Sequence, residues 1–243
     1  MLIALAKKKV PRDLAGREDV ITSTVLGPLR YLDATQVWRV VRHLLGDDAV
    51  GFPEPPAGAA GATVEFWPRQ CVPHDQTMCE PDVVIELCRV NEPCCARVII
   101  EVKWNAPASG VDQLARQKAA FGLGPVPCWH VYLTKHHLRA DEDIEAAGLS
   151  SGEVINLPWS LLVSRLSQLS RLPEMEGDGL LKAWATDVGG AMERLGVVPF
   201  SGFAGAVPRS VEPGLFMFFN AFAGFTEVAA LLPQSGTFDF FHA

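Results

Sequence analysis

Two apolar runs joined by a short polar segment constrain the fold of this chain more than any other feature. The runs are DVVIELC at 82–88 and ARVIIEVK at 96–103, and the segment VNEP at 90–93 lies between them. Short runs rich in Val and Ile, bounded by turn residues, are typical of buried β-strands. We therefore expect an antiparallel hairpin, and pairing about the centre of VNEP places residues whose numbers sum to 183 opposite each other.

This register gives the two faces of the hairpin different characters. On one face only apolar residues meet, as in the pair Val83 and Ile100. On the other face Asp82 lies opposite Glu101, and Lys103 points the same way because it is two residues further along the strand. Like charges opposite each other destabilise a sheet, and a divalent cation bound by oxygen ligands removes the repulsion. The two carboxylates are therefore predicted to approach within about 6 Å and to hold a metal ion.

Periodicity and end signals predict the elements around the hairpin: helices at 17–32, 34–45 and 109–122, and strands at 63–70 and 128–137. The first helix is expected to be interrupted near Gly27 and Pro28. The second is expected to begin after Asp33, with Gln36 completing a capping box. The order helix, helix, strand, strand, strand, helix, strand predicts an α/β fold in which helices flank a mixed central sheet.

The pattern changes after residue 158, which divides the chain into a predicted core at 1–158 and a mostly helical C-terminal accessory lobe at 159–243. Helices are expected near 160–171 and 179–195. A Phe-rich apolar segment follows at 215–232, and Glu227 lies within it. A charged residue in the middle of a membrane span is costly, so we interpret this segment as core or as a partner-binding face, and we expect no membrane contact.

The composition limits the classes of function. A net charge of −7 argues against a protein that coats nucleic acid by charge alone, so any contact with DNA must be local. The N-terminal apolar run is too short for a signal peptide and precedes its basic cluster, so a cytoplasmic location is expected. The six cysteines are then expected to be reduced, and their spacings do not form a zinc-binding pattern.

One motif on the hairpin carries a resemblance. Pro81 and Asp82, followed after eighteen residues by Glu101, Val102 and Lys103, are similar to the PD-(D/E)XK signature of the restriction-endonuclease-like nuclease superfamily. The resemblance spans roughly residues 13–138 and implies the fold of that superfamily.

The resemblance also implies roles for the motif residues. Asp82, Glu101 and the carbonyl of Val102 would hold a Mg²⁺ or Mn²⁺ ion. Lys103 would stabilise charge on the phosphate and favour the hydroxide form of the attacking water. These roles are chemically reasonable, because such an ion is a Lewis acid that lowers the pKa of bound water, and a nearby ammonium group assists. The ordinary alternative is that these residues form a solvated strand end.

Three residues outside the motif fit the same context. Glu18 lies in the first predicted helix and would bind a second ion or orient water. Gln113 and Gln117 are spaced to share one face of the helix that follows the hairpin, and either would position the nucleophile or contact the DNA backbone. Each also has an ordinary interpretation, Glu18 as a surface charge and the two glutamines as solvent-facing residues.

The sequence thus predicts a Mg²⁺-dependent endonuclease that hydrolyses phosphodiester bonds in DNA. By analogy with the superfamily, it would serve restriction or phage defence. The acidic composition suggests delivery by an ATPase or a DNA-recognition subunit, and cutting both strands suggests a homodimer. Two alternatives stay open: a catalytically silent restriction-like scaffold that binds partners through its Phe-rich tail, and a DNA repair or junction-resolving nuclease.

Overall fold

The computed structural model describes residues 17–55, 60–89, 94–104, 112–122, 124–135, 137–150, 152–169, 171–172 and 178–197. They belong to the first of two units into which the chain divides, Met1–Ser201. The segment predicted to be core or a partner-binding face, 215–232, lies outside the described residues.

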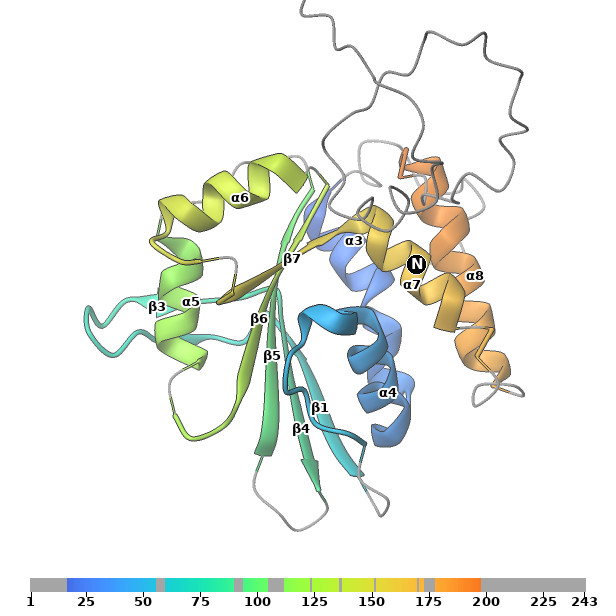
Figure 1. The fold of residues 1–243 in the computed structure, drawn as a ribbon, viewed down its shortest axis with the longest axis horizontal. Coiled ribbons are helices and arrows are strands. Elements are labelled where there is room, and N and C mark those ends of the chain that lie inside the picture. Colours follow the sequence, from blue (N-terminus) through green and yellow to red (C-terminus); the bar gives the residue numbers. More distant parts are fainter. Residues whose placement is uncertain are drawn as a thin grey trace, which may run out of the picture. The chain divides into compact units, whose positions relative to one another are not determined.

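A mixed sheet forms the centre of the fold (Figure 1). Within the described residues its order is β1-β4-β5-β6-β7. Strands β1, β4 and β5 pair antiparallel, and β5, β6 and β7 pair parallel. The strands are β1 (Ala60–Phe66), β4 (Val83–Arg89), β5 (Cys94–Lys103), β6 (Cys128–Thr134) and β7 (Val154–Pro158). A separate small ribbon pairs β2 (Gln70–Cys71) with β3 (Met78–Cys79).

The hairpin register matches the prediction. Val83 pairs with Ile100, and the pairing continues in step as far as Leu87 opposite Ala96. A bulge between Leu87 and Cys88 then shifts the register, which the apolar pattern did not predict. The side-chain period of two therefore holds over the part of the hairpin that leads to the motif.

Helices cover both faces of the sheet, which confirms the predicted fold class (Figure 1). One face carries α3 (Glu18–Val25), α4 (Ala34–Leu45), α7 (Trp159–Leu169) and α8 (Gly179–Arg194), with the 3₁₀ turns η1 (Gly27–Tyr31) and η2 (Gly46–Asp48). The other face carries α5 (Gln113–Phe121) and α6 (His137–Ala146). Helix α6 and strand β7 were not predicted, and α5 begins later than predicted, since Asp112 is its N-cap.

Local signals explain where α3 and α4 begin and end. The predicted interruption near Gly27 and Pro28 is the change from α3 to η1. At the start of α4 the backbone N–H of Gln36 donates to Asp33 Oδ1 at 2.8 Å, and the Asp33 N–H donates to Gln36 Oε1 at 2.9 Å. This is the predicted capping box, which satisfies backbone groups that have no partner within the helix.

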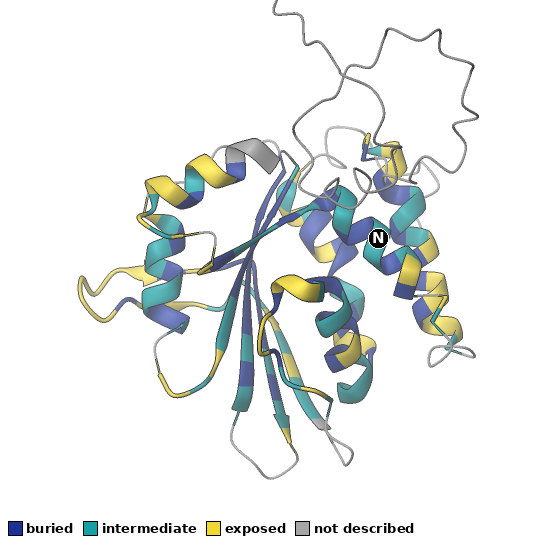
Figure 2. Cartoon of the chain, viewed as in Figure 1, coloured by how far each residue is buried: buried dark blue, intermediate teal, exposed yellow. Residues whose placement is uncertain are grey.

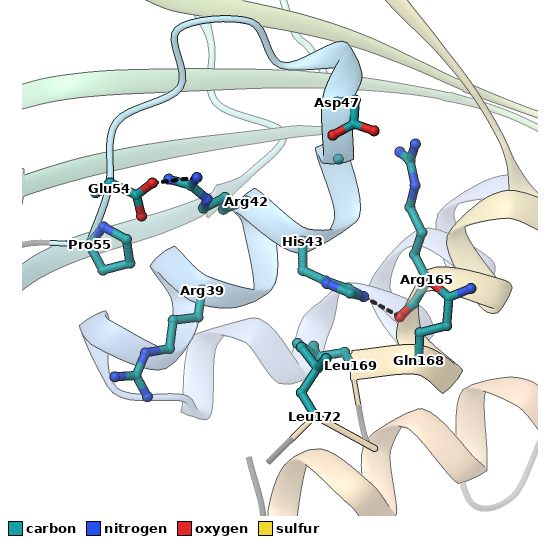
Figure 3. A pocket seen from close by; sticks show the side chains of 11 residues that line it. Arg39, Arg42, His43, Asp47, Glu54, Pro55, Arg165, Gln168, Leu169 and Leu172 are labelled. Atoms are coloured by element: carbon teal, nitrogen blue, oxygen red, sulfur yellow. Dashed lines mark hydrogen bonds and ion pairs between the residues drawn. The ribbon is translucent and has the colours of Figure 1, made fainter. Parts of the chain in front are cut away.

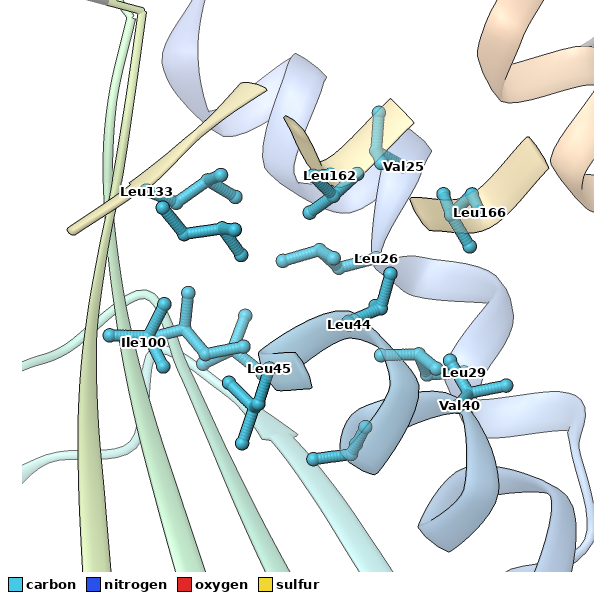
Figure 4. Packing of buried hydrophobic residues seen from close by; sticks show 14 of the residues in the cluster. Val25, Leu26, Leu29, Val40, Leu44, Leu45, Ile100, Leu133, Leu162 and Leu166 are labelled. Carbon is cyan, nitrogen blue, oxygen red and sulfur yellow. The ribbon is translucent and has the colours of Figure 1, made fainter. Parts of the chain in front are cut away.

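The main hydrophobic core lies between the sheet and the α3, α4, α7 and α8 layer (Figure 4). Leu26 and Leu44 from the helices pack toward Ile100 and Leu133 from the strands, and Leu162 from α7 joins them. Figure 2 shows buried residues along the central strands and on the adjoining sides of the helices. Helices α7 and α8, which open the region predicted as a C-terminal lobe, share this core with the sheet.

None of the helices among the described residues is long and apolar enough to cross a membrane.

Candidate active site

Four polar side chains are buried at the end of the hairpin where it meets α5. They are Asp82, Glu101, Lys103 and Gln117. Glu101 exposes only 2% of its surface and Gln117 exposes none, although both carry strongly hydrated groups. Buried polar groups of this kind require partners, because loss of hydration is otherwise uncompensated. The interpretation as a solvated strand end is therefore wrong.

Asp82 is held by three contacts just before β4 begins. Its Oδ2 accepts from the Val102 N–H at 2.8 Å, and its Oδ1 accepts from Trp67 Nε1 at 3.2 Å. The Trp67 backbone N–H donates to the Asp82 carbonyl at 3.0 Å. These contacts place the Asp82 carboxylate beside the strand that carries Glu101. The approach of the Asp82 and Glu101 carboxylates to within about 6 Å stays a prediction.

Glu101 is the centre of the hydrogen-bond network. Lys103 Nζ donates to Glu101 Oε1 at 2.7 Å, since residues two apart on a strand share a face. Gln113 Nε2 donates to the same oxygen at 2.6 Å, and Gln117 Nε2 donates to Oε2. Gln113 and Gln117 share one face of α5, as the i,i+4 spacing predicted, and the structure directs both of them to the Glu101 carboxylate. The solvent-facing interpretation is wrong for Gln117.

Helix α3 brings Glu18 to the same site from far away in the sequence. Lys103 Nζ donates to Glu18 Oε1 at 3.4 Å, and the backbone N–H of Trp104 donates to Glu18 Oε2 at 2.8 Å. Lys103 thus lies between two carboxylates. The structure brings together the predicted site residues, which are Asp82, Glu101, Val102, Lys103, Glu18, Gln113 and Gln117. Their roles in catalysis remain predictions.

The site holds more acidic than basic groups, and the pKa values of its side chains are shifted from their ordinary values. Burial, and then repulsion from Glu101, raises the pKa of Asp82 to about 7, against the hydrogen bond from Val102. Burial also raises the pKa of Glu101, although Lys103 and Gln117 oppose it. Burial alone would lower the pKa of Lys103, but Glu101, Glu18 and Asp82 together raise it. Three carboxylates therefore share one ammonium group.

This donor set fits a hard divalent cation. Each carboxylate oxygen has two lone pairs, and the contacts made by Asp82 with described residues use one on each oxygen. Among the described residues, no three His, Cys, Asp or Glu side chains converge closely enough to hold a metal by themselves. Mg²⁺ does not require that, since it is commonly bound through one or two carboxylates with water completing its shell. Asp82, Glu101 and the Val102 carbonyl are the oxygen groups that would bind such an ion.

The raised pKa of Asp82 predicts a pH-dependent stability difference in metal-free protein. Above the folded pKa of about 7, wild type holds an ionised carboxylate where the folded state disfavours it, and Asp82→Asn does not. The variant should therefore gain stability over wild type as pH rises from about 4 to 8, by as much as ~4 kcal/mol. Urea unfolding of both proteins in a chelator, at matched pH values, measures this difference.

His130 contributes to the pH dependence of stability with the opposite sign, because burial lowers the pKa of its ring to about 4. Both proteins contain His130, so subtracting the unfolding free energy of wild type from that of the variant cancels this contribution. A difference that is constant over this range would contradict the prediction.

Two residues of the network were missed in the sequence. Trp67 directly follows β1 and has a φ of 52°, a left-handed conformation that is unusual for a bulky residue. It contacts Asp82 through both its backbone and its side chain. His130 Nε2 lies 2.9 Å from Gln117 Oε1. The histidine in an otherwise apolar strand was a visible signal, but its partner depends on how α5 packs on β6.

A separate hollow of about 650 Å³ lies between α4 and α7, on the opposite face of the sheet (Figure 3). Arg165 Nη1 donates to the carbonyls of Leu44 and Leu45 at 2.6 and 2.9 Å, so it satisfies groups at the end of α4. His43 Nε2 lies 2.8 Å from the Arg165 carbonyl oxygen. These basic side chains join the two helices, and none of the candidate active-site residues lines this hollow.

No protein-family model matches this chain, and no curated protein matches it either. Among solved structures, the chain is similar to the MspJI restriction endonuclease in complex with a 27-mer oligonucleotide, at a TM-score of 0.30 and 16% sequence identity. The match covers 77% of this chain and 34% of that one, so this chain spans about a third of the length of the structure it matches. Such similarity is too low for residue roles to be transferred, and we therefore infer function from the site's own geometry.

Proposed function

We propose that this chain is a metal-dependent endonuclease that hydrolyses phosphodiester bonds in DNA. The observation that carries the proposal is the buried contact between Glu101 and Lys103, beside Asp82 and under α5. The site combines a buried acid that has a raised pKa with a second acid and a single lysine. Such an arrangement is suited to a hydrolysis in which negative charge develops on the substrate. Buried charged groups of this kind do not stabilise an ordinary hydrophobic core.

Asp82, Glu101 and the carbonyl of Val102 would hold Mg²⁺ or Mn²⁺ in this proposal. When bound, the ion supplies a Lewis acid that lowers the pKa of bound water and offsets charge on the phosphate. The excess negative charge of the site supports this assignment, because burial and then repulsion from Glu101 raise the pKa of Asp82, and a divalent cation removes that repulsion.

The remaining residues would orient these groups. Lys103 would donate to a non-bridging phosphate oxygen, where its positive charge stabilises the charge that develops during attack. Glu18 would keep the Lys103 ammonium and the chain at Trp104 in place through the contacts described above. Gln113 and Gln117 would hold the Glu101 carboxylate in one orientation.

A cytoplasmic role in restriction or phage defence is our proposal for the biological setting. A net charge of −7 supports reliance on a second component, such as an ATPase or a DNA-recognition subunit, to bring the chain to DNA. Cutting both strands of a duplex would require a homodimer or two successive nicks.

The test is a nicking assay on supercoiled plasmid with Mg²⁺ or Mn²⁺, comparing wild type with Glu101→Gln. We expect metal-dependent conversion to nicked and linear forms by wild type only. Conversion by both proteins would indicate a contaminating nuclease or a different site. No conversion of plasmid, with cleavage of branched DNA, would favour a junction-resolving enzyme. No cleavage of any substrate would favour a silent scaffold.

A further inference from the structure

The proposed chemistry leaves His130, a buried titratable side chain near the site, without a role. His130 lies on β6, exposes 3% of its surface and lies opposite Ile99 of the neighbouring strand. Its Nε2 contacts Gln117 Oε1 at 2.9 Å, and among the described residues its buried Nδ1 has no hydrogen-bond partner. His130 is thus joined to Glu101 through the side-chain amide group of Gln117.

The chemistry of the three side chains assigns the direction of both hydrogen bonds. Glu101 forms an ion pair with Lys103, and its Oε2 accepts from Gln117 Nε2, so the NH₂ group of Gln117 faces Glu101. The amide oxygen of Gln117 then faces His130, and that oxygen can only accept. His130 Nε2 must therefore carry a proton. A neutral imidazole carries one proton, which leaves Nδ1 as a bare acceptor, consistent with its lack of a partner.

We propose that His130 is a positioning residue for the metal-binding carboxylate. The Nε2–H group of His130 holds the Gln117 amide in the one orientation that presents NH₂ to Glu101. An amide turned the other way would place its oxygen against the carboxylate, and the two would repel. This inference rests on the proposed nuclease function, because the orientation of Glu101 matters most if it binds a metal.

The burial of the ring agrees with this role. Burial, and secondarily the charge of Lys118, lowers the pKa of His130 to about 4, so the ring stays neutral under ordinary conditions. A neutral ring protonated on Nε2 supplies the required donor and leaves no proton on the unpartnered, buried Nδ1. Removing a direct partner of a metal ligand typically changes metal affinity or activity by about 10- to 100-fold, and His130 acts through such a partner, Gln117.

The first experiment measures the tautomer in metal-free wild-type protein by ¹⁵N NMR of the histidine rings. We expect His130 to show a protonated Nε2, a bare Nδ1 and no titration between about pH 6 and 8. A neutral ring protonated on Nδ1, which would leave Nε2 without a proton to donate to Gln117, would overturn the inference. This readout does not depend on activity or on a bound metal.

The second experiment compares substitutions. His130→Leu removes the donor, and His130→Gln retains an N–H close to the position of Nε2. We expect His130→Leu to lower Mn²⁺ affinity, measured by calorimetry, and the nicking rate by about 10- to 100-fold. His130→Gln should recover most of both. His43→Leu is the matched control, because it removes another histidine hydrogen bond on the opposite face and should change neither quantity.

The outcomes separate this inference from the proposed function. If wild type nicks DNA and His130→Leu nicks equally fast with equal Mn²⁺ affinity, His130 has no positioning role and the nuclease assignment stands. If wild type neither binds Mn²⁺ nor nicks any DNA, both proposals fail together. If His130→Leu does not fold, the tautomer in wild type and the activity of His130→Gln still decide the inference.

Discussion

Replacing Lys103 with methionine should slow DNA cleavage by roughly 10²–10³ while leaving Mn²⁺ affinity unchanged or higher. Methionine preserves much of the length of the side chain and removes its charge. The proposed phosphate contact is lost, so the rate falls. An ammonium group cannot bind Mg²⁺ and repels it, and Lys103 contacts a predicted ligand, Glu101, at 2.7 Å. Its removal therefore frees that carboxylate for the ion.

Lys118→Met provides the matched control for this experiment. Lys118 forms an ion pair with Glu153 that is partly exposed, and it makes no hydrogen bond to Asp82, Glu101 or Glu18. Its loss should leave cleavage and Mn²⁺ affinity at wild-type values. Calorimetry with Mn²⁺ and a nicking time course, run on both variants, measure the two quantities. Wild-type cleavage by Lys103→Met would mean that Lys103 is only a structural ion-pair partner, and the nuclease assignment would lose its main support.

Glu101→Gln and Asp82→Asn should each lower Mn²⁺ affinity by at least about 100-fold and reduce DNA cleavage to background. Each variant removes one negative charge and replaces a carboxylate oxygen with an NH₂ group that cannot bind a cation. With one carboxylate remaining in place of two, the site loses half of the ligand charge proposed to attract this strongly hydrated ion. The effect should therefore appear in the binding isotherm as well as in the rate, unlike that of Lys103→Met.

The control for the carboxylate variants is Glu86→Gln on the same hairpin. Glu86 Oε1 accepts from Arg97 Nε at 2.9 Å and from Nη2 at 2.6 Å, so it serves as a cross-strand ion-pair partner. Its neutralisation should alter neither Mn²⁺ binding nor cleavage. Normal metal binding by Asp82→Asn and Glu101→Gln would show that any ion binds elsewhere, and the scaffold alternative would then be favoured.

The buried excess of acid is the physical basis for both expectations. Ionised carboxylates are disfavoured in a buried site, and one lysine balances only one of the three. A fold maintained for stability alone would gain from replacing Asp82 with a neutral residue. Sites that accept such a loss of stability are typically functional ones, where the charges act on a ligand.

The sequence by itself determined the register of the hairpin from Val83 to Leu87. A strand's side-chain period of two and the symmetric apolar pattern about 90–93 are local information, and this register leaves one face of the hairpin wholly apolar. The positions of Asp82, Glu101 and Lys103 on the other face followed directly. Capping of α4 by Asp33 was equally local, because its partner Gln36 lies one turn away.

Only the tertiary structure decided which side chains surround the hairpin's acidic end. The approach of Glu18 depends on α3 packing against β5, and the burial of Gln117 depends on α5 lying over the other face. The contact of Gln117 with His130 requires the parallel pairing of β5 with β6 as well. Such placements minimise the exposed apolar surface of the whole domain, a quantity to which every element contributes, so no local pattern can encode them.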